Sequence, residues 1–155
     1  MGRGVVTIRF FPLFSNYIYR LCNDVASIKY ATTTVLQEFD RDGVVYLELR
    51  TTPRSFDETG LTRARYVETV IDAICEYNAS SSSMKTYLIL SVDRRDTPEK
   101  AQECVELAIR YKSRGIVGVD LCGDPLVKTQ ILPSITCASP QKKGKNQGCM
   151  WGKGG

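Results

Sequence analysis

The sequence predicts an α/β fold in which three parallel strands alternate with helices. Short apolar runs rich in β-branched residues alternate with longer segments of helical periodicity, and the connections between runs are long enough to contain a crossover helix. Polar residues follow each predicted strand, at Thr51–Arg54, Asp93–Arg95 and Asp120–Asp124. Because the carboxyl ends of parallel strands meet at one edge of a sheet, we expect these residues to gather there.

The first predicted helix begins after Asn23 or Asp24, either of which can serve as its N-cap. Its apolar residues recur at helical spacing, and Gly43 follows where a left-handed residue is expected to end it. These apolar residues are Val25, Ile28, Val35, Leu36 and Phe39. The run Val44–Leu49 then has the composition of a strand covered on both faces, and Pro53 lies beyond its end.

The second predicted helix has Thr62 as its N-cap and ends before a serine-rich loop. One face of it is apolar and consists of Tyr66, Val67, Val70, Ile71, Ile74 and Tyr77. A predicted strand follows at residues 86–92. The third helix starts at Thr97-Pro98-Glu99, which combines an N-cap, a proline at the first helical position and a carboxylate near the positive end of the helix dipole. Its predicted buried stripe is Ala101, Cys104, Val105 and Ala108, and the third strand is residues 116–121.

The regular pattern ends at about residue 125. Residues 126–155 contain five lysines and no acidic residue, so with a net charge of +4 for the whole chain the first 125 residues carry −1. Residues 126–135 are mixed in composition, and residues 136–155 are rich in Lys, Gly, Asn and Gln without any period, which is typical of a disordered tail. No aromatic platform or basic helical stripe accompanies the lysines, and we therefore expect no nucleic-acid binding.

The composition also bears on redox state and membranes. Six cysteines are irregularly spaced and the chain has no histidine, so neither a disulfide framework nor a mixed zinc site is expected. No apolar run approaches the ~20 residues of a membrane-spanning helix, and the N-terminus lacks a signal-peptide pattern. We expect a cytoplasmic protein with reduced cysteines and no membrane association.

Three segments, in this order, resemble the adenosine deaminase superfamily, and specifically its adenosine deaminase-like branch of N6-methyl-AMP deaminases. They are Tyr46–Arg54 (YLELRTTPR), Tyr87–Arg95 (YLILSVDRR) and Gly118–Pro125 (GVDLCGDP). The Thr-Thr-Pro-Arg sequence after the first strand is the part specific to this branch. The resemblance covers about residues 10–125 and implies a zinc-dependent hydrolase on a (β/α)8 TIM-type barrel, of which this chain would supply about three βα units.

The resemblance implies that the loop of Thr51, Thr52, Pro53 and Arg54 contacts a nucleotide. Hydroxyls, backbone N–H groups and a guanidinium suit a phosphate better than a neutral nucleoside. An ordinary turn at the end of a strand is the alternative interpretation of the same residues. Tyr19 departs from the family, because relatives carry a histidine against the substrate at that position.

Two further substrate contacts follow from the resemblance. Asp93 matches a carboxylate that would hold a ribose hydroxyl, and its alternative role is a salt bridge to Arg94 or Arg95. Gly123 matches a glycine whose missing side chain lets the backbone approach the purine, and its alternative is a turn that requires a positive φ.

The family's zinc ligands are a His-x-His pair, a later histidine and an aspartate, and a His-x-x-Glu glutamate handles protons. Without histidine the chain contains none of the His motifs, so we assign no catalytic and no metal-binding residue and expect no zinc in it. The sequence predicts a purine deaminase fragment, inactive alone, whose residues 1–125 are a barrel segment and whose residues 126–155 are a basic tail.

The predicted ligand is a purine nucleoside monophosphate, and open barrel edges would permit self-association. The alternative function is a small α/β module that binds a nucleotide or phosphate without catalysis.

Overall fold

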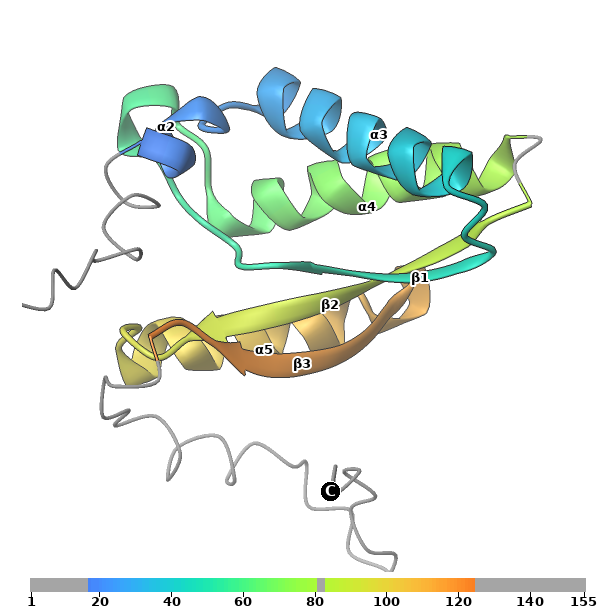
Figure 1. Cartoon of the computed structure of the whole chain (residues 1–155). Coiled ribbons are helices and arrows are strands. Elements are labelled where there is room, and N and C mark those ends of the chain that lie inside the picture. The colour runs from blue at the N-terminus through green and yellow to red at the C-terminus, as the bar shows by residue number, and fades with distance from the viewer. Residues whose placement is uncertain (1–16, 81–82, 125–155) are drawn as a thin grey trace, which may run out of the picture.

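The computed structural model of the chain describes residues 17–80 and 83–124 (Figure 1). Within them the three strands form one parallel sheet in the order β1-β2-β3. The elements in chain order are α2 (Tyr19–Leu21), α3 (Val25–Arg41), β1 (Tyr46–Thr51), η2 (Asp57–Thr59), α4 (Arg63–Ala79), β2 (Lys85–Asp93), α5 (Pro98–Arg110), η3 (Lys112–Arg114) and β3 (Ile116–Cys122). The predicted α/β class and parallel sheet are confirmed. The predicted tail, residues 126–155, lies outside the described residues.

The three long helices begin at the predicted caps. Asp24, rather than Asn23, caps α3: its carboxylate accepts a hydrogen bond from the backbone of Ser27 at 2.7 Å, and the Ser27 hydroxyl accepts one in return. Thr62 and Thr97 cap α4 and α5 through their hydroxyls. Each cap satisfies a backbone N–H that would otherwise have no partner in the first turn.

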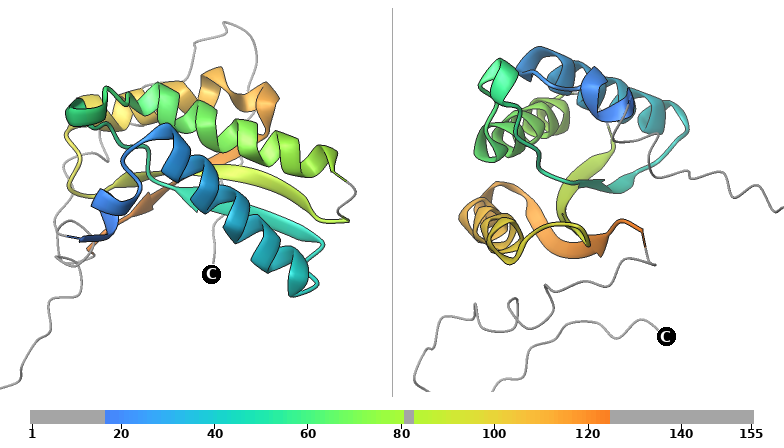
Figure 2. Two further views of the ribbon diagram at one scale, coloured as in Figure 1. Left: turned by 90° about the horizontal axis from the view of Figure 1, so that it is seen from above. Right: turned by 90° about the vertical axis from the view of Figure 1, so that its left-hand side faces the viewer.

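The hydrophobic core lies between β2 and the two helices that flank it in sequence. Figure 2 shows α4 and α5 along one face of the curved sheet, as the right-handed crossovers of parallel strands require. The buried side chains include Leu88, Leu90 and Val92 of β2, Val67, Ile71 and Ile74 of α4, and Ala101, Cys104 and Leu107 of α5. Val105, predicted to be in this stripe, is only half-buried, because Leu107 is the α5 residue that turns toward the core.

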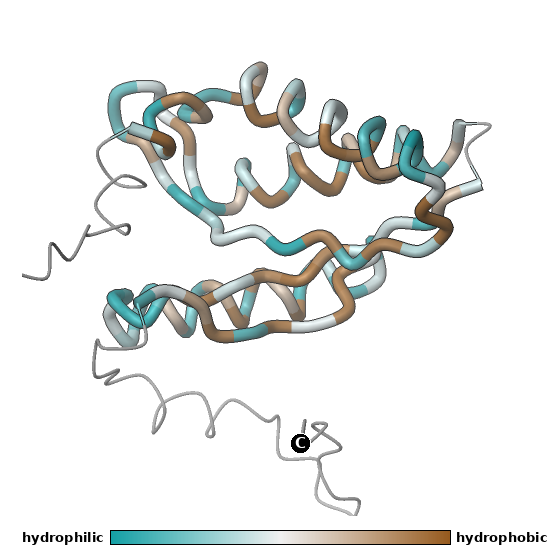
Figure 3. Tube along the Cα trace, in the orientation of Figure 1, coloured by the Kyte–Doolittle hydropathy of each residue, from teal (hydrophilic) through white to brown (hydrophobic). Residues whose placement is uncertain are grey.

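The predicted burial of the first helix and the first strand is partly wrong. In α3 the buried residues are Ile28, Thr32 and Leu36, whereas Val25, Val35 and Phe39 are each 38% exposed. Strand β1 alternates between exposed and half-buried residues instead of being covered on both faces. The reason is that, within residues 17–80 and 83–124, β1 pairs only with β2, and α3 packs mainly on α4 (Figures 1 and 3).

Among residues 17–80 and 83–124, no helix combines the length and the apolar character that crossing a membrane would require.

Candidate functional site

The polar residues that follow the three strands lie together at one edge of the sheet, as the strand order predicts. The Thr52 hydroxyl, after β1, lies 3.3 Å from the Cys122 thiol at the end of β3. The backbone N–H of Arg94, after β2, donates to the Cys122 carbonyl at 2.9 Å. Gly123 packs against Asp93, since a Cβ on this glycine would lie 2.7 Å from an Asp93 carboxylate oxygen. Residues from all three strand ends thus form one continuous surface.

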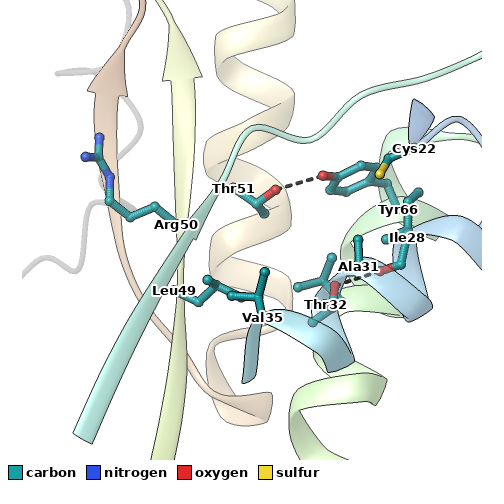
Figure 4. A pocket seen from close by; sticks show the side chains of 10 residues that line it. Cys22, Ile28, Ala31, Thr32, Val35, Leu49, Arg50, Thr51 and Tyr66 are labelled. Carbon is teal, nitrogen blue, oxygen red and sulfur yellow. Dashed lines mark hydrogen bonds between the residues drawn. The ribbon is translucent and has the colours of Figure 1, made fainter. Parts of the chain in front are cut away.

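The loop after β1 divides between two cavities. Thr51 shares a hydrogen bond of 2.8 Å with the Tyr66 hydroxyl and lines a cavity of about 140 Å³ between α3, α4 and β1 (Figure 4). The next three residues, Thr52, Pro53 and Arg54, line a separate cavity of about 540 Å³. The structure therefore brings Thr52, Pro53 and Arg54 to one cavity, whereas the Thr51 hydroxyl points toward Tyr66 of α4.

The larger cavity carries mixed charge. Arg20, Arg54 and Lys100 contribute cationic groups to its lining, and Asp57 and Glu58 contribute carboxylates. Lys100 belongs to the first turn of α5, whose N-terminus contributes a partial positive charge to this side of the cavity. An anionic ligand would thus meet cations from the N-terminal segment, from the loop after β1 and from α5.

The Arg54 guanidinium stacks on Tyr19. Its central carbon lies 3.3 Å from the centroid of the Tyr19 ring, a geometry that combines packing with cation–π attraction. The charge of Arg54 also acts on its neighbours. Burial raises the pKa of the Tyr66 hydroxyl above its ordinary value, and the hydrogen bond with Thr51 and the charge of Arg54 oppose that rise.

Asp93 is 5% exposed and is bound by Arg95. One carboxylate oxygen accepts hydrogen bonds from Nε and from the backbone N–H of Arg95, each at 2.9 Å, and the other accepts one from a terminal guanidinium nitrogen at 2.6 Å. Burial alone would raise the pKa of this carboxyl, but the Arg95 hydrogen bonds and the charges of Arg95 and Arg54 hold it below its ordinary value. The salt bridge anticipated as the alternative role of Asp93 is therefore present.

Gly123 has a φ of 97°, a backbone conformation that residues with a side chain rarely adopt. Both this turn and the close approach of Asp93 require glycine here. Neither Gly123 nor Asp93 lines the larger cavity, so the structure places these two residues beside the loop cavity rather than in its wall.

Sequence reasoning missed two contributors to this region, Arg63 and Cys122. Arg63 is 6% exposed at the start of α4 and lines the larger cavity. A charged residue in the first turn of a helix is usually solvated, so no local pattern identifies it. Cys122 is half-buried against Thr52 because it ends a strand at the shared edge, and only the strand register indicates this contact.

The zinc that the resemblance implies does not fit the described residues. Between residues 17 and 124, apart from 81–82, no group of three or more Cys, Asp or Glu side chains is arranged to hold a metal ion, and the sequence has no histidine.

Comparisons with known proteins identify the family. The model of the adenosine deaminase family matches residues 8–137, beyond the boundary that we predicted at residue 125. The N6-methyl-AMP deaminase of Danio rerio is 43% identical over 113 residues, which are 71% of this chain and 32% of that protein. The N6-mAMP deaminase of Arabidopsis thaliana is 36% identical and covers 84% of this chain and 43% of that protein.

Solved structures give the same result. The crystal structure of Arabidopsis ADAL complexed with IMP superimposes with a TM-score of 0.75 at 36% identity, covering 81% of this chain and 39% of that chain. An amidohydrolase with bound Zn has a TM-score of 0.63 at 13% identity and shares the fold alone. This chain spans between about a third and two fifths of the length of these relatives. Its three-stranded parallel sheet matches part of a TIM-type barrel, and the chain belongs to the adenosine deaminase family.

Proposed function

We propose that this chain is the nucleotide-binding part of an N6-methyl-AMP deaminase type of barrel, and that its ligand is a purine nucleoside monophosphate. The observation that carries the proposal is the convergence of Thr52, Arg54 and Lys100 on one cavity of about 540 Å³ at the carboxyl ends of the strands. Two crystal structures of the Arabidopsis relative, complexed with IMP and with GMP, support a ligand of this class.

In this proposal the phosphate lies against Arg54. Stacking on Tyr19 occupies one flat face of the guanidinium, and the N–H groups lie along its edges, where they can form the paired hydrogen bonds that phosphate oxygens accept. Among the described residues the Thr52 hydroxyl has the weak Cys122 thiol as its hydrogen-bond partner, so it can turn to the ligand. Thr51, hydrogen-bonded to the Tyr66 hydroxyl, would anchor the loop to α4. Pro53 would restrict the backbone of the loop.

Asp93 and Gly123 would contact the ribose and the purine edge. The second carboxylate oxygen of Asp93 accepts one hydrogen bond from the Arg95 guanidinium, so a lone pair remains for a ribose hydroxyl. Gly123 exposes backbone without a side chain next to that carboxylate, which permits a flat base to approach.

We further propose that this chain, tested alone, does not deaminate purines, because it lacks the histidine ligands that a zinc-activated water requires. The assignment of residues 1–125 to a barrel segment and of residues 126–155 to a tail, and the cytoplasmic location, remain predictions.

Titration of labelled protein tests the proposal. AMP, N6-methyl-AMP and adenosine are added to the wild type, to Arg54→Ala and to a control, Arg41→Ala, whose exposed side chain pairs with Glu38 at the end of α3. Hydrogen bonds to charged groups contribute about 1.5–3 kcal/mol, so Arg54→Ala should weaken AMP binding by roughly tenfold to a hundredfold. Arg41→Ala should bind as the wild type does. Equal affinity for adenosine and AMP would show that the phosphate assignment is wrong.

A further inference from the structure

Arg63, the first residue of α4, is a buried arginine whose side chain joins three segments of the chain. Its Nε donates to the Pro53 carbonyl at 3.1 Å, in the loop after β1. One terminal nitrogen donates to the Lys100 carbonyl at 2.9 Å and to the Glu103 carboxylate at 3.3 Å, both on α5. The other terminal nitrogen lies 3.6 Å from the carboxylate of Asp96, in the turn after β2.

These contacts indicate a structural role for the guanidinium rather than a direct contact with ligand. Burying a guanidinium is costly unless hydrogen bonds replace the lost water. Here the carbonyls of Pro53 and Lys100 and the Glu103 carboxylate accept hydrogen bonds, and the Asp96 carboxylate adds an ion pair at 3.6 Å. Arg63 lines the cavity, but both its Nε and its terminal nitrogens are directed to protein acceptors. Three of its five N–H groups therefore donate to protein acceptors, and the other two lie on the terminal nitrogen that faces the Asp96 carboxylate.

The Pro53 carbonyl, which accepts the Arg63 hydrogen bond, determines how the backbone enters Arg54. The Pro53 carbonyl belongs to the same planar peptide unit as the Arg54 N–H, so fixing its oxygen fixes the direction in which the chain enters Arg54. The proline ring restricts φ of Pro53, and the hydrogen bond to its carbonyl oxygen restricts ψ of the same residue. The base of the Arg54 side chain is thereby oriented before any ligand arrives.

Asp96 connects the same guanidinium to the end of β2. Its carboxylate lies near Arg63 and also accepts the Asp93 backbone N–H at 3.2 Å. The Arg63 side chain therefore connects the loop after β1 to the turn after β2, whose Asp96 is hydrogen-bonded to Asp93 at the end of that strand.

We propose that Arg63 is a positioning residue: it fixes the Pro53–Arg54 peptide against α5 and the turn after β2, so that Arg54 meets the phosphate at low entropic cost. Its importance for binding rests on the proposed function, whereas the fixing of the loop is independent of any ligand. The gain is preorganisation, because a loop that is already ordered loses less conformational freedom on binding.

The test compares Arg63→Lys and Arg63→Gln with a matched control, Arg65→Gln. Arg65 lies on the same helix, and its exposed side chain pairs with Glu68 at 3.5 Å. Backbone relaxation without nucleotide should show order parameters of Thr52, Arg54 and Ser55 falling from about 0.85 toward 0.6 in both Arg63 variants and staying high in the control. AMP affinity should fall about tenfold in both variants. Lysine keeps the positive charge but lacks the planar set of N–H donors that the guanidinium presents. Wild-type loop order and AMP affinity in Arg63→Lys would therefore overturn the proposal.

A measurement on the wild type alone keeps the inference testable if the variants unfold. The side-chain Nε–H resonance of Arg63 should stay in place as AMP saturates the protein, while that of Arg54 shifts. An Arg63 shift as large as that of Arg54 would make Arg63 a direct ligand and contradict the inference. If the wild type binds no AMP, the proposed function fails, and loop order in the variants still decides whether Arg63 fixes the loop.

Discussion

Strands β2 and β1 have similar apolar composition but different surroundings. β2 pairs on both sides, and Leu88, Leu90 and Val92 on its helix-facing side are buried. Within the described residues β1 pairs on one side only; Val45, just before it, is 65% exposed and Tyr46, its first residue, is 55% exposed. The difference shows that composition indicates how much burial a strand can accept, whereas the strands and helices beside it determine how much it is actually buried.

The largest expected effect tests this difference directly. Leu88→Ala in β2 removes a side chain that is 1% exposed, and it should lower the free energy of unfolding by about 2–5 kcal/mol. Leu47→Ala in β1 removes a half-buried side chain and should cost about 1–2 kcal/mol, since part of that surface is already in water. Urea unfolding of both variants gives the comparison. Equal losses would mean that β1 is as well packed in solution as β2.

A second pair of variants compares the turn before β1 with the turn after β3, which packs against the end of β2. Gly43 precedes β1 with a φ of 81° and open space around it, so Gly43→Ala should cost only the backbone strain, about 1 kcal/mol. Gly123→Ala adds a clash with Asp93 at the end of β2 and should cost about 2–3 kcal/mol. Thermal unfolding compares the two. A cost for Gly123→Ala no larger than that for Gly43→Ala would show that the Asp93 carboxylate moves aside easily.

The smallest expected effect is the pH dependence that Asp93 contributes. Its pKa is lower in the folded state than in the unfolded chain, because Arg95 binds the carboxylate. The stabilisation is therefore present above the unfolded pKa of about 4 and is lost as the pH falls through the folded pKa. The difference in urea midpoint between the wild type and Asp93→Asn should be constant from pH 7 to pH 5 and should shrink below pH 4. A constant difference down to pH 2.5 would contradict this assignment.

The sequence predicts the elements well because their signals are local. Asp24, Thr62 and Thr97 each cap a helix through residues three positions away, and those caps are present. The burial of α3 is less well predicted, because Val35 and Phe39 have the right period but depend on whether α3 covers β1 or α4. Periodicity gives the face of a helix and not the partner of that face.

The candidate site likewise has features that the sequence could predict and features that it could not. That Thr52, Asp93 and Gly123 share one edge follows from strand order and could be predicted. That the hydroxyl of Thr51 turns to Tyr66 could not, since this depends on side-chain geometry between segments fifteen residues apart. The role of Arg63 was also hidden, because its acceptors include backbone carbonyls, which every sequence has.

The contacts of Arg63 also bear on the order in which the chain folds. They connect residues separated by 10, 37 and 40 positions, so most of them form only after α4, β2 and α5 have been assembled. The helices have local caps, so we expect them to form earlier. A nascent chain released from the ribosome as far as β2 therefore contains Thr52, Pro53 and Arg54 in the correct order but without a fixed geometry. We therefore expect the loop after β1 to reach its final shape only once α5 has docked.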